Sequence, residues 1–453
     1  MTYNTAVTQH CDLLIENCKA TLPDSSIAEG TSIVIDQGRI LAMGPAAQVR
    51  KQYHPAAVLD GQDKLAIPGF VDAHTHLAQQ LLRGGVVDEP PIIWQRILVP
   101  FENALSTEAL YAGARLSCLQ MAKAGITAFV DSGTGDMRPI IQATIETGMR
   151  ANIARMSRDY GSFIPEQFKD SPKIVIQKTE DMYKEFHGAA NGRIEVAFSA
   201  TSLQTTSPEL LEGVAAAAKQ YGTIIHIHLA EHLKEVGQCL TQFGLRPVEY
   251  LERYGALGPN LLGAHAVQLS DREICMLAEH DAKPVHCPSS NLGSHGFPKT
   301  TTMLTLGMKV GMGTDGASSI DLDLFGQMRL LRFAINARFG LPIFDPMTLP
   351  VTTLFKMPTL YSAAALQLEK EVGSLEIGKK ADIVLLKWKE VPFYPAQKDF
   401  PMLVMVAGPR DVNDVIIDGQ LIVKDRVHQL VDEDEVMAKA DEQMKTILKK
   451  MRW

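Results

Sequence analysis

Two histidines separated by one residue end the apolar run FVDAHTHLAQ, which follows Pro68 and Gly69. Alternate residues of a β-strand point to the same face, so we expect His74 and His76 to face together while Thr75 faces away. Two neutral imidazoles presented side by side at a strand end can form half of a divalent-metal site. The same spacing fits a polar pair that faces water, and the dipeptide pattern alone favours neither interpretation.

Other histidines and acidic residues lie at the ends of further β-like runs. His226, His228 and Glu231 stand in HIHLAEH, His265 ends LLGAH, and Asp315 lies in GMGTDGASS. Three imidazoles and a carboxylate suit Zn²⁺ or Fe²⁺, with a position left for water. We expect His228 to be a ligand because Glu231 follows just past its strand, whereas His226 is interpreted as a core residue. Asp315 closes its strand and is interpreted as a ligand, the alternative being a cap of the next turn.

The remaining histidines and the competing motifs are interpreted as structural. His286 in VHCPSSN is expected to support the site, and His232, His280 and His295 are expected on the surface or in loops. GMGTDG fits the dinucleotide pattern GxGxxG, but its aspartate would stand where a pyrophosphate needs amide donors. GSLEIGKK places Lys380 where a phosphate loop needs Ser or Thr, and no GxSxG nucleophile motif occurs.

The elements that must position these residues alternate along the middle of the chain. Eight strands are predicted at residues 69–74, 126–131, 151–156, 194–199, 223–229, 261–265, 283–287 and 309–315. Helical apolar spacing separates most of them, at residues 106–124, 208–221 and 270–280, the last with Ser270 as N-cap. Eight such repeats predict an α/β fold, a (βα)8 TIM-type barrel with its chemistry at the carboxyl ends of the strands. A doubly wound open sheet is the alternative.

The sequence pattern at both ends of the chain predicts short strands joined by turns. Residues 1–67 and 376–453 are therefore predicted to form one small β-sandwich domain, with an amphipathic helix from about Glu433 to Met451. Residues 68–375 are then the catalytic barrel.

The composition is that of an ordinary globular protein of 453 residues, with 46% hydrophobic and 21% charged residues. A net charge of -8 without a long basic run argues against nucleic-acid binding. No apolar run approaches the roughly 18 to 20 residues of a membrane span, and the first residues lack a secretory pattern. Six cysteines without a CxxC pair read as reduced thiols, so a cytoplasmic protein is predicted.

Six stretches in this order resemble the amidohydrolase superfamily: PGFVDAHTH, HIHLAEH, GAHAVQL, HCPSSNL, GTDGASS and GSLEIGKKADIVLL. They are most similar to the cytosine/adenosine-deaminase-like branch, which includes S-adenosylhomocysteine, methylthioadenosine, guanine and 8-oxoguanine deaminases and triazine hydrolases. The resemblance implies one divalent ion, Zn²⁺ before Fe²⁺, since RIEVAFSATSLQTTS lacks the lysine that bridges two metals in binuclear relatives. It implies the metal ligands His74, His76, His228 and Asp315.

The resemblance also assigns proton transfer. Glu231 would be the proton shuttle and His265 would orient the attacking water, with Asp315 helping to accept its proton. The metal would bring the pKa of that water toward about 7, giving hydroxide. The expected reaction is hydrolytic deamination of an aminated purine, pterin, pyrimidine or triazine. Displacement of chloride or an alkylamine, as in triazine hydrolases, is the alternative, and a catalytically silent binding homologue is a third.

The sequence departs from adenosine-acting relatives on the fourth strand. Their PHAPYTCS-like stretch is ATSLQTTS here, so Thr201 stands in the place of a substrate-contacting histidine, which argues against a nucleoside. In the loop after the first strand, Gln79, Trp94 and Glu102 are predicted to line the pocket, the alternatives being packing for Trp94 and a solvated charge for Glu102. Arg155 or Arg158 would hold an anionic or carbonyl group of the substrate, or form a surface ion pair. Family members are often dimers or tetramers, which implies a homo-oligomer here.

Overall fold

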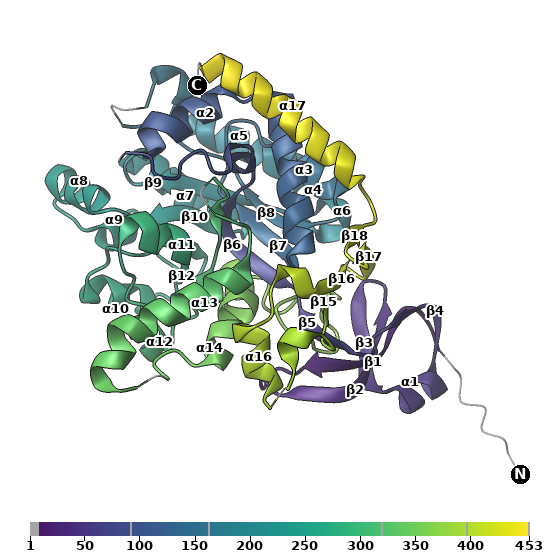
Figure 1. Cartoon of the computed structure of the whole chain (residues 1–453). Helices are drawn as coiled ribbons and strands as arrows, with labels where there is room; N and C mark the ends of the chain where they lie inside the picture. Colours follow the sequence, from purple (N-terminus) through teal and green to yellow (C-terminus); the bar gives the residue numbers. More distant parts are fainter. Residues whose placement is uncertain are drawn as a thin grey trace, which may run out of the picture.

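The computed structural model describes residues 9–90, 93–161, 164–318, 320–345, 347–395 and 397–451. These residues form a barrel surrounded by helices and a separate sheet made from both ends of the chain (Figure 1).

The barrel strands follow one another in sequence order and are parallel. They are β6 (Phe70–His76), β7 (Ile126–Asp131), β8 (Arg150–Ala154), β9 (Ile194–Ser202), β10 (Ile225–Leu229), β11 (Leu261–His265), β12 (Lys283–His286), β13 (Gly311–Met312) and β14 (Asp315–Gly316). β13 pairs with β12 and β14 pairs with β6, so the short segment 311–316 closes the ring. The predicted barrel is confirmed, and the eight predicted strands lie within a few residues of the observed ones.

Local capping explains where the principal helices begin. In α3 (Thr107–Lys123), α7 (Pro208–Tyr221) and α10 (Asp271–Glu279), a serine side chain before the first turn accepts a hydrogen bond from a backbone N–H of that turn. These serines are Ser106, Ser207 and Ser270. Ser270 and Glu273 form a reciprocal capping box, as the predicted N-cap implies. None of the helices in the described ranges is long and apolar enough to cross a membrane.

The longer helices of the barrel are α3 (Thr107–Lys123), α4 (Arg138–Glu146), α5 (Pro172–Phe186), α7 (Pro208–Tyr221), α8 (Leu233–Phe243), α9 (Pro247–Arg253), α10 (Asp271–Glu279) and α13 (Leu324–Ile335). Shorter helices of the barrel are α2 (Val99–Ala104), α6 (Ala189–Gly192), α11 (Pro288–Ser290), α12 (Thr300–Thr305), α14 (Val351–Lys356) and α15 (Ser362–Ala365). Two further helices are α1 (Ala46–Gln52), which packs on the strands of the terminal sheet, and α16 (Asp399–Met405), which packs against α13 and α14.

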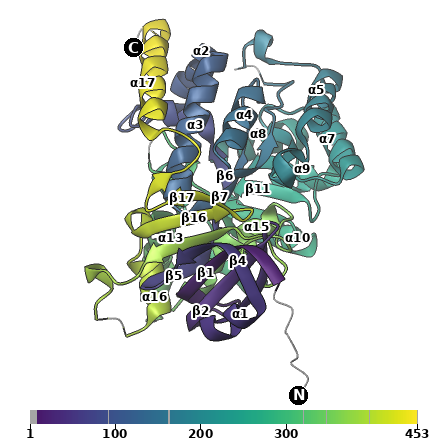
Figure 2. The same ribbon diagram turned by 90° about the vertical axis from the view of Figure 1, so that its right-hand side faces the viewer.

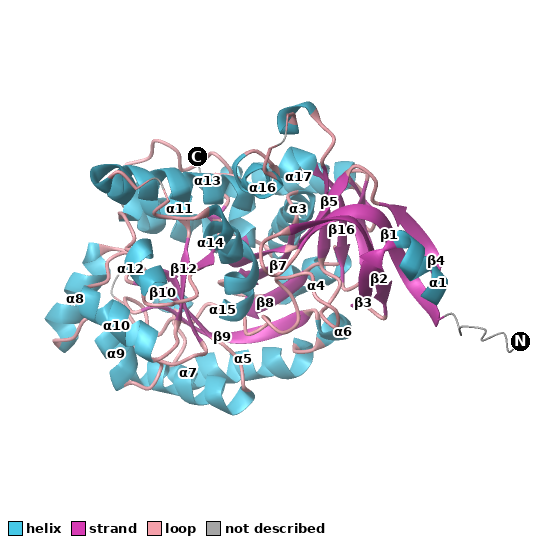
Figure 3. Cartoon of the chain, turned by 90° about the horizontal axis from the view of Figure 1, so that it is seen from below, coloured by secondary structure: helices cyan, strands magenta, loops and turns pink. Residues whose placement is uncertain are grey.

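The second sheet joins the two ends of the chain and lies to one side of the barrel (Figure 3). Its strands are β1 (Gln9–Thr21), β2 (Ile27–Asp36), β3 (Arg39–Pro45), β4 (Tyr53–Asp60), β5 (Lys64–Pro68), β15 (Ile383–Lys387), β16 (Val412–Ile417), β17 (Gln420–Lys424) and β18 (Val427–His428). β5 pairs with β15, and β1 pairs with β4 along its first half and with β5 near its end. The strands thus form one continuous hydrogen-bonded sheet around an apolar core that includes Ile15, Ile33 and Ile383. The domain boundaries near residues 67 and 376 stay a prediction.

A buried ion pair joins this sheet to the amino ends of the barrel strands. Arg150, the first residue of β8, donates two hydrogen bonds of 2.8 and 3.0 Å to Asp382, which precedes β15. The two side chains are only 4% and 1% exposed. The contact lies at the opposite end of the strands from His76 and His265.

The last helix, α17 (Glu433–Met451), lies along α3 on the outside of the barrel (Figures 1 and 2). Its apolar face packs against the segment between β6 and α3. Ala440 and Ile447 share a hydrophobic cluster with Leu81, just after β6, and with Phe101 of α2. The amphipathic helix is present as predicted, and its packing surface is the barrel, although the sequence grouped it with the terminal sheet.

Candidate active site

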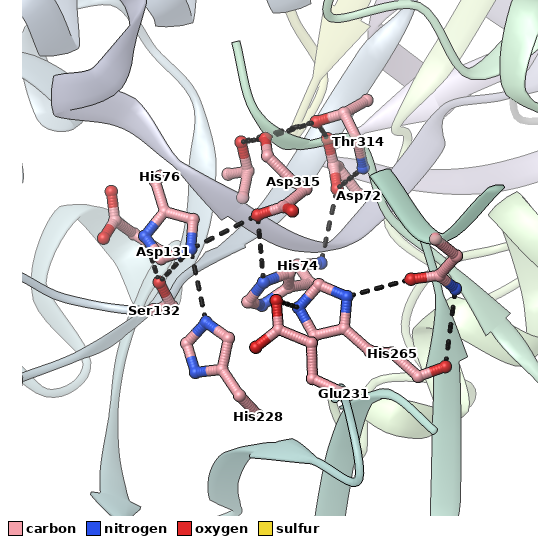
Figure 4. Close-up of polar contacts among 12 residues, drawn as sticks. Asp72, His74, His76, Asp131, Ser132, His228, Glu231, His265, Thr314 and Asp315 are labelled. Atoms are coloured by element: carbon pink, nitrogen blue, oxygen red, sulfur yellow. Dashed lines mark hydrogen bonds and ion pairs between the residues drawn. The ribbon is translucent and has the colours of Figure 1, made fainter. Parts of the chain in front are cut away.

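The first barrel strand presents His74 and His76 to the same place, as its alternation predicts (Figure 4). Nδ1 of His76 lies 2.6 Å from the Ser132 hydroxyl, just after β7. Asp131 at the end of β7 accepts the backbone N–H of Leu77 at 3.0 Å. The end of the first strand is therefore held by the end of the second.

Asp72 ties the first strand to the eighth. Its carboxylate accepts the Thr314 backbone N–H at 3.0 Å and the Thr314 hydroxyl at 2.5 Å (Figure 4). The backbones of the first and eighth strands approach so closely that position 313 needs a glycine. A Cβ at Gly313 would lie 2.7 Å from the carbonyl oxygen of His74. Asp315 follows with a φ of 61°, an uncommon conformation that is often retained where geometry matters for function.

The predicted ligands converge. Asp315 Oδ1 lies 3.4 Å from Nε2 of His74 and 3.4 Å from Nε2 of His76. His228 Nε2 lies 3.3 Å from His76 Nε2, while its Nδ1 lies 2.6 Å from the Thr201 carbonyl oxygen. Atoms that each bind one zinc ion tetrahedrally at about 2.1 Å lie about 3.4 Å apart. The spacing of these donors therefore fits a single metal ion.

The protonation states of three of the four predicted ligands fit a metal as well. Burial lowers the pKa of His74 to about 4 and holds that of His228 well below its ordinary value, so both imidazoles are neutral at pH 7. Burial opposes ionisation of Asp315, but the neighbouring His74 and His76 hold its pKa well below the usual range. Nε2 of His74 is buried and has no hydrogen-bond partner among the described residues, as expected of an atom that binds a cation.

His226 lies behind this group. It is buried, and its Nε2 lies 2.9 Å from Nδ1 of His74. The expectation of a core residue is therefore confirmed, and the ring of His226 contacts a predicted ligand. His286 contacts the His265 carbonyl oxygen at 3.0 Å through Nδ1, in keeping with a supporting role.

Glu231 and His265 face each other next to the predicted ligands (Figure 4). Glu231 Oε1 lies 3.8 Å from His265 Nε2, which is buried without a hydrogen-bond partner in the described ranges. Nδ1 of His265 lies 3.0 Å from the side-chain oxygen of Asn291. The buried carboxylate of Glu235 accepts the backbone N–H groups of Ala230 and Glu231, both at 3.1 Å. The loop that carries Glu231 is thereby fixed.

Two histidines that the sequence placed on the surface or in loops lie beside Glu231. His295 Nε2 is 3.1 Å and His232 Nε2 is 3.5 Å from Glu231 Oε1. The expectation is wrong for His295, whose side chain is only 8% exposed, and holds for His232, which is 44% exposed. Burial would raise the pKa of Glu231, but His265 and these two imidazoles lower it, so the group is an ionised base at pH 7.

Four of the predicted substrate residues share one wall of the site. Arg158 Nη2 lies 3.7 Å from Glu102 Oε2, and its guanidinium carbon lies 5.5 Å from the centre of the Trp94 ring. Gln79 fills the space beside Gly316, where a Cβ would lie 1.8 Å from its side-chain oxygen, and its side chain opposes the rise that burial causes in the pKa of Glu102. Glu102 is 10% exposed as a side chain, so it is not a solvated surface charge.

The other two predicted contacts are engaged elsewhere. Thr201 Oγ1 accepts the Ser157 backbone N–H at 2.9 Å, and its carbonyl oxygen contacts His228. Arg155 forms the predicted alternative, an ion pair of 3.3 Å with Asp170.

Sequence reasoning missed several supporting residues: Asp72, Asp131, Ser132, Glu235, Asn291 and His295. Asp131 ends β7 and Ser132 follows it directly, and this position at a strand end is the signal that could have found them, whereas Asp72 lies inside β6. Asn291 and His295 are the first and last residues of a five-residue π-helix after β12, which is too short to show a periodic pattern.

Known proteins share this arrangement over almost the whole chain. Residues 65–422 match the model of the amidohydrolase family. The 5-methylthioadenosine/S-adenosylhomocysteine deaminase of Thermoanaerobacter pseudethanolicus is 33% identical over 444 residues, covering 97% of this chain and 100% of the relative.

Solved structures agree. An adenosine deaminase from Xanthomonas campestris with bound zinc superposes with a TM-score of 0.91 at 28% identity, covering 98% of this chain and 100% of the other. A triazine hydrolase variant has a TM-score of 0.84 at 23% identity, covering 95% and 99%, which shows the fold alone. The chain belongs to the amidohydrolase family.

Proposed function

We propose that this protein is a metal-dependent hydrolytic deaminase of an aminated nitrogen heterocycle, with adenine nucleosides as the first substrates to test. The observation that carries the proposal is the ionised carboxylate of Glu231, 3.8 Å from His265 and beside the neighbouring donors of His74, His76, His228 and Asp315. The deaminase names of the relatives support the same chemistry.

His74, His76, His228 and Asp315 would hold the metal, for which zinc is the first choice and iron(II) the second. A divalent ion at this place lowers the pKa of a bound water toward about 7. The second oxygen of Asp315 and Nε2 of His265 are the acceptors available to orient that water and take its proton.

Glu231 is placed to move protons between water and substrate. Its carboxylate can accept a proton, deliver it to a ring nitrogen, and later protonate the departing amine. Asn291 fixes the ring of His265, and Glu235 fixes the backbone of Glu231, so the two groups keep their separation during turnover.

The wall formed by Trp94, Glu102 and Arg158 supports a substrate with both a flat ring and hydroxyl groups. An indole stacks on a heterocycle, and a buried carboxylate accepts hydrogen bonds from sugar hydroxyls. Glu102 lies close to the predicted metal ligands, because its charge acts on His76. Burial lowers the pKa of His76, but the contact with Asp315 and the charges of Asp131 and Glu102 together raise it above its ordinary value.

Displacement of a ring substituent such as chloride or an alkylamine is the second candidate. The observation that favours it is Thr201, whose hydroxyl is bonded to Ser157 and whose strand therefore offers no imidazole to the substrate. The two candidates differ in the product released.

The deciding experiment is ammonia release by zinc-reconstituted protein across aminated purines, their nucleosides, pterins, pyrimidines and triazines. Glu231→Gln should lose about 10²–10⁴-fold in turnover. Glu252→Gln removes a carboxylate from an exposed pair with His280 and is the matched control. Turnover that survives Glu231→Gln unchanged would refute the assigned shuttle, and release of chloride without ammonia would establish the second candidate.

We further propose that the enzyme works in the cytoplasm as a homodimer or homotetramer. Support for the location comes from the cysteines: all six are unpaired, and five are buried. Size-exclusion chromatography with light scattering tests the assembly.

A further inference from the structure

A second group of metal-binding side chains lies beside the first and shares none of its four predicted ligands. Glu231, His232 and His295 each offer one donor atom, and these atoms lie within 4.8 Å of one another. Both imidazoles direct Nε2 toward the same carboxylate oxygen, at 3.5 Å for His232 and 3.1 Å for His295. These separations are close to the roughly 3.4 Å expected between ligands of one tetrahedral zinc ion.

The surroundings hold His295 in this position. Gln268 donates its side-chain N–H to the His295 carbonyl oxygen at 2.5 Å, and its backbone N–H bonds to Ala230, next to Glu231. Within the described residues, the only ion-pair partner of the His295 ring is Glu231, and its Nδ1 is buried and makes no hydrogen bond. The ring also packs edge-on against His265, with centroids 5.2 Å apart, so it stands between the proton-transfer residues and solvent-exposed His232.

His232 completes the group from the exposed side. Its ring lies edge-on to that of His295, with ring centroids 4.4 Å apart, and its side chain is 44% exposed. A cation can reach the group from solvent, and water can complete its coordination.

We propose that Glu231, His232 and His295 bind a second divalent cation, zinc first, that stops turnover when it is bound. Two imidazoles and one carboxylate are an established zinc ligand set, with water in the remaining position. A carboxylate bound to a cation is a weaker base and cannot carry a proton to the substrate. The second ion thus competes with the proton for the carboxylate of Glu231, so excess zinc inhibits the enzyme. The inhibition, but not the binding, rests on the proposed function.

The first test counts metal ions. Protein carrying its first zinc ion is dialysed against a series of buffered free-zinc concentrations, and bound zinc is measured by atomic emission. We expect a second zinc ion per chain in the wild type but not in His232→Asn or His295→Asn. His280→Asn, which removes an exposed imidazole 3.4 Å from Glu252, should behave as the wild type. Because His232 is exposed, its variant keeps the site testable if His295→Asn does not fold.

The second test follows the rate of ammonia release over the same zinc series. The wild-type rate should fall as the second ion binds, and His232→Asn should raise the half-inhibitory zinc concentration by about tenfold or more. One zinc ion per chain throughout, or equal inhibition of wild type and both variants, would overturn the proposal. A protein that binds the second ion but deaminates nothing would contradict the proposed function and leave the second metal site established.

Discussion

His228 donates its Nδ1–H to the backbone carbonyl of Thr201 at 2.6 Å, which turns Nε2 toward His76. A hydrogen bond to one ring nitrogen determines which nitrogen remains free to bind a metal. This predicted ligand is thus positioned by the backbone of β9, and the side chain of Thr201 is not required for it.

Thr201→Val should therefore affect stability more than substrate binding. The change removes the acceptor of the Ser157 N–H, and an unsatisfied buried donor costs about 1–3 kcal/mol. We expect a lower denaturant midpoint with KM changed less than about threefold. A large increase in KM, with unchanged stability, would instead establish Thr201 as a substrate contact.

Asn291→Ala should slow turnover without removing the metal. Its side-chain oxygen lies 3.0 Å from His265 Nδ1, so the variant frees the imidazole to rotate, and misplacement of a reacting group costs about 10²-fold in kcat. Metal content measured beside kcat separates this effect from ligand loss. Asn260→Ala is the matched control, because Asn260 precedes β11 and donates its side-chain N–H to the Thr223 carbonyl oxygen at the amino ends of the strands, away from His265.

Glu102→Gln should raise KM for nucleosides about tenfold, equivalent to about 1.4 kcal/mol, and leave KM for the free bases unchanged. The reason is the loss of a buried charged acceptor beside Arg158. Glu89→Gln, in the exposed pair with Arg96 in the same loop, is the control. Equal effects on nucleoside and base would rule out a contact to the sugar.

His428→Asn should weaken the dependence of stability on pH. Burial lowers the pKa of His428 to about 4, and its Nδ1 accepts the N–H groups of Leu430 and Val431. The unfolded imidazole titrates near 6.5, so between about pH 6.5 and 4 the unfolded chain binds more protons and stability rises with pH.

The wild type should therefore lose about 2 kcal/mol more than His428→Asn in the free energy of unfolding between pH 7.5 and pH 5. Urea unfolding at both pH values measures the difference, with His280→Asn as the exposed control. Identical pH slopes for wild type and His428→Asn would show that this imidazole is not neutral when folded.

Arg150→Met should destabilise the fold by about 3–5 kcal/mol, because it leaves the buried carboxylate of Asp382 unpaired. The double variant with Asp382→Leu should recover much of the loss, since an apolar pair replaces an ion pair. Urea unfolding gives both values. A double variant less stable than Arg150→Met would contradict this account.

The barrel and its predicted ligands could be read from the sequence because two regular patterns coincide. Strands alternate with helices, and polar residues follow apolar runs where strands end, so His74, His228 and Asp315 mark one mouth of the barrel. Each strand end can be recognised from its local sequence, and the topology of the barrel brings these ends together.

Other features depend on contacts that no local pattern encodes. His295 ends a short π-helix (Asn291–His295), and its burial beside Glu231 depends on how that segment packs over the barrel. The amphipathic pattern of α17 predicts an apolar face but does not name its partner. The sequence suggests a substrate contact for Thr201 because of its residue type, whereas its backbone carbonyl, which contacts His228, decides its role.

The pairing of the two chain ends has a consequence for biosynthesis. Lys64 beside β15 and β16 contacts Asp414 at 2.7 Å, across 350 positions of sequence. While the ribosome makes the barrel, β5 therefore waits without its partner strand, and its open edge is a surface on which newly made chains can associate. Only after β15 and β16 emerge is this edge covered, so the protein should depend on chaperones late in translation.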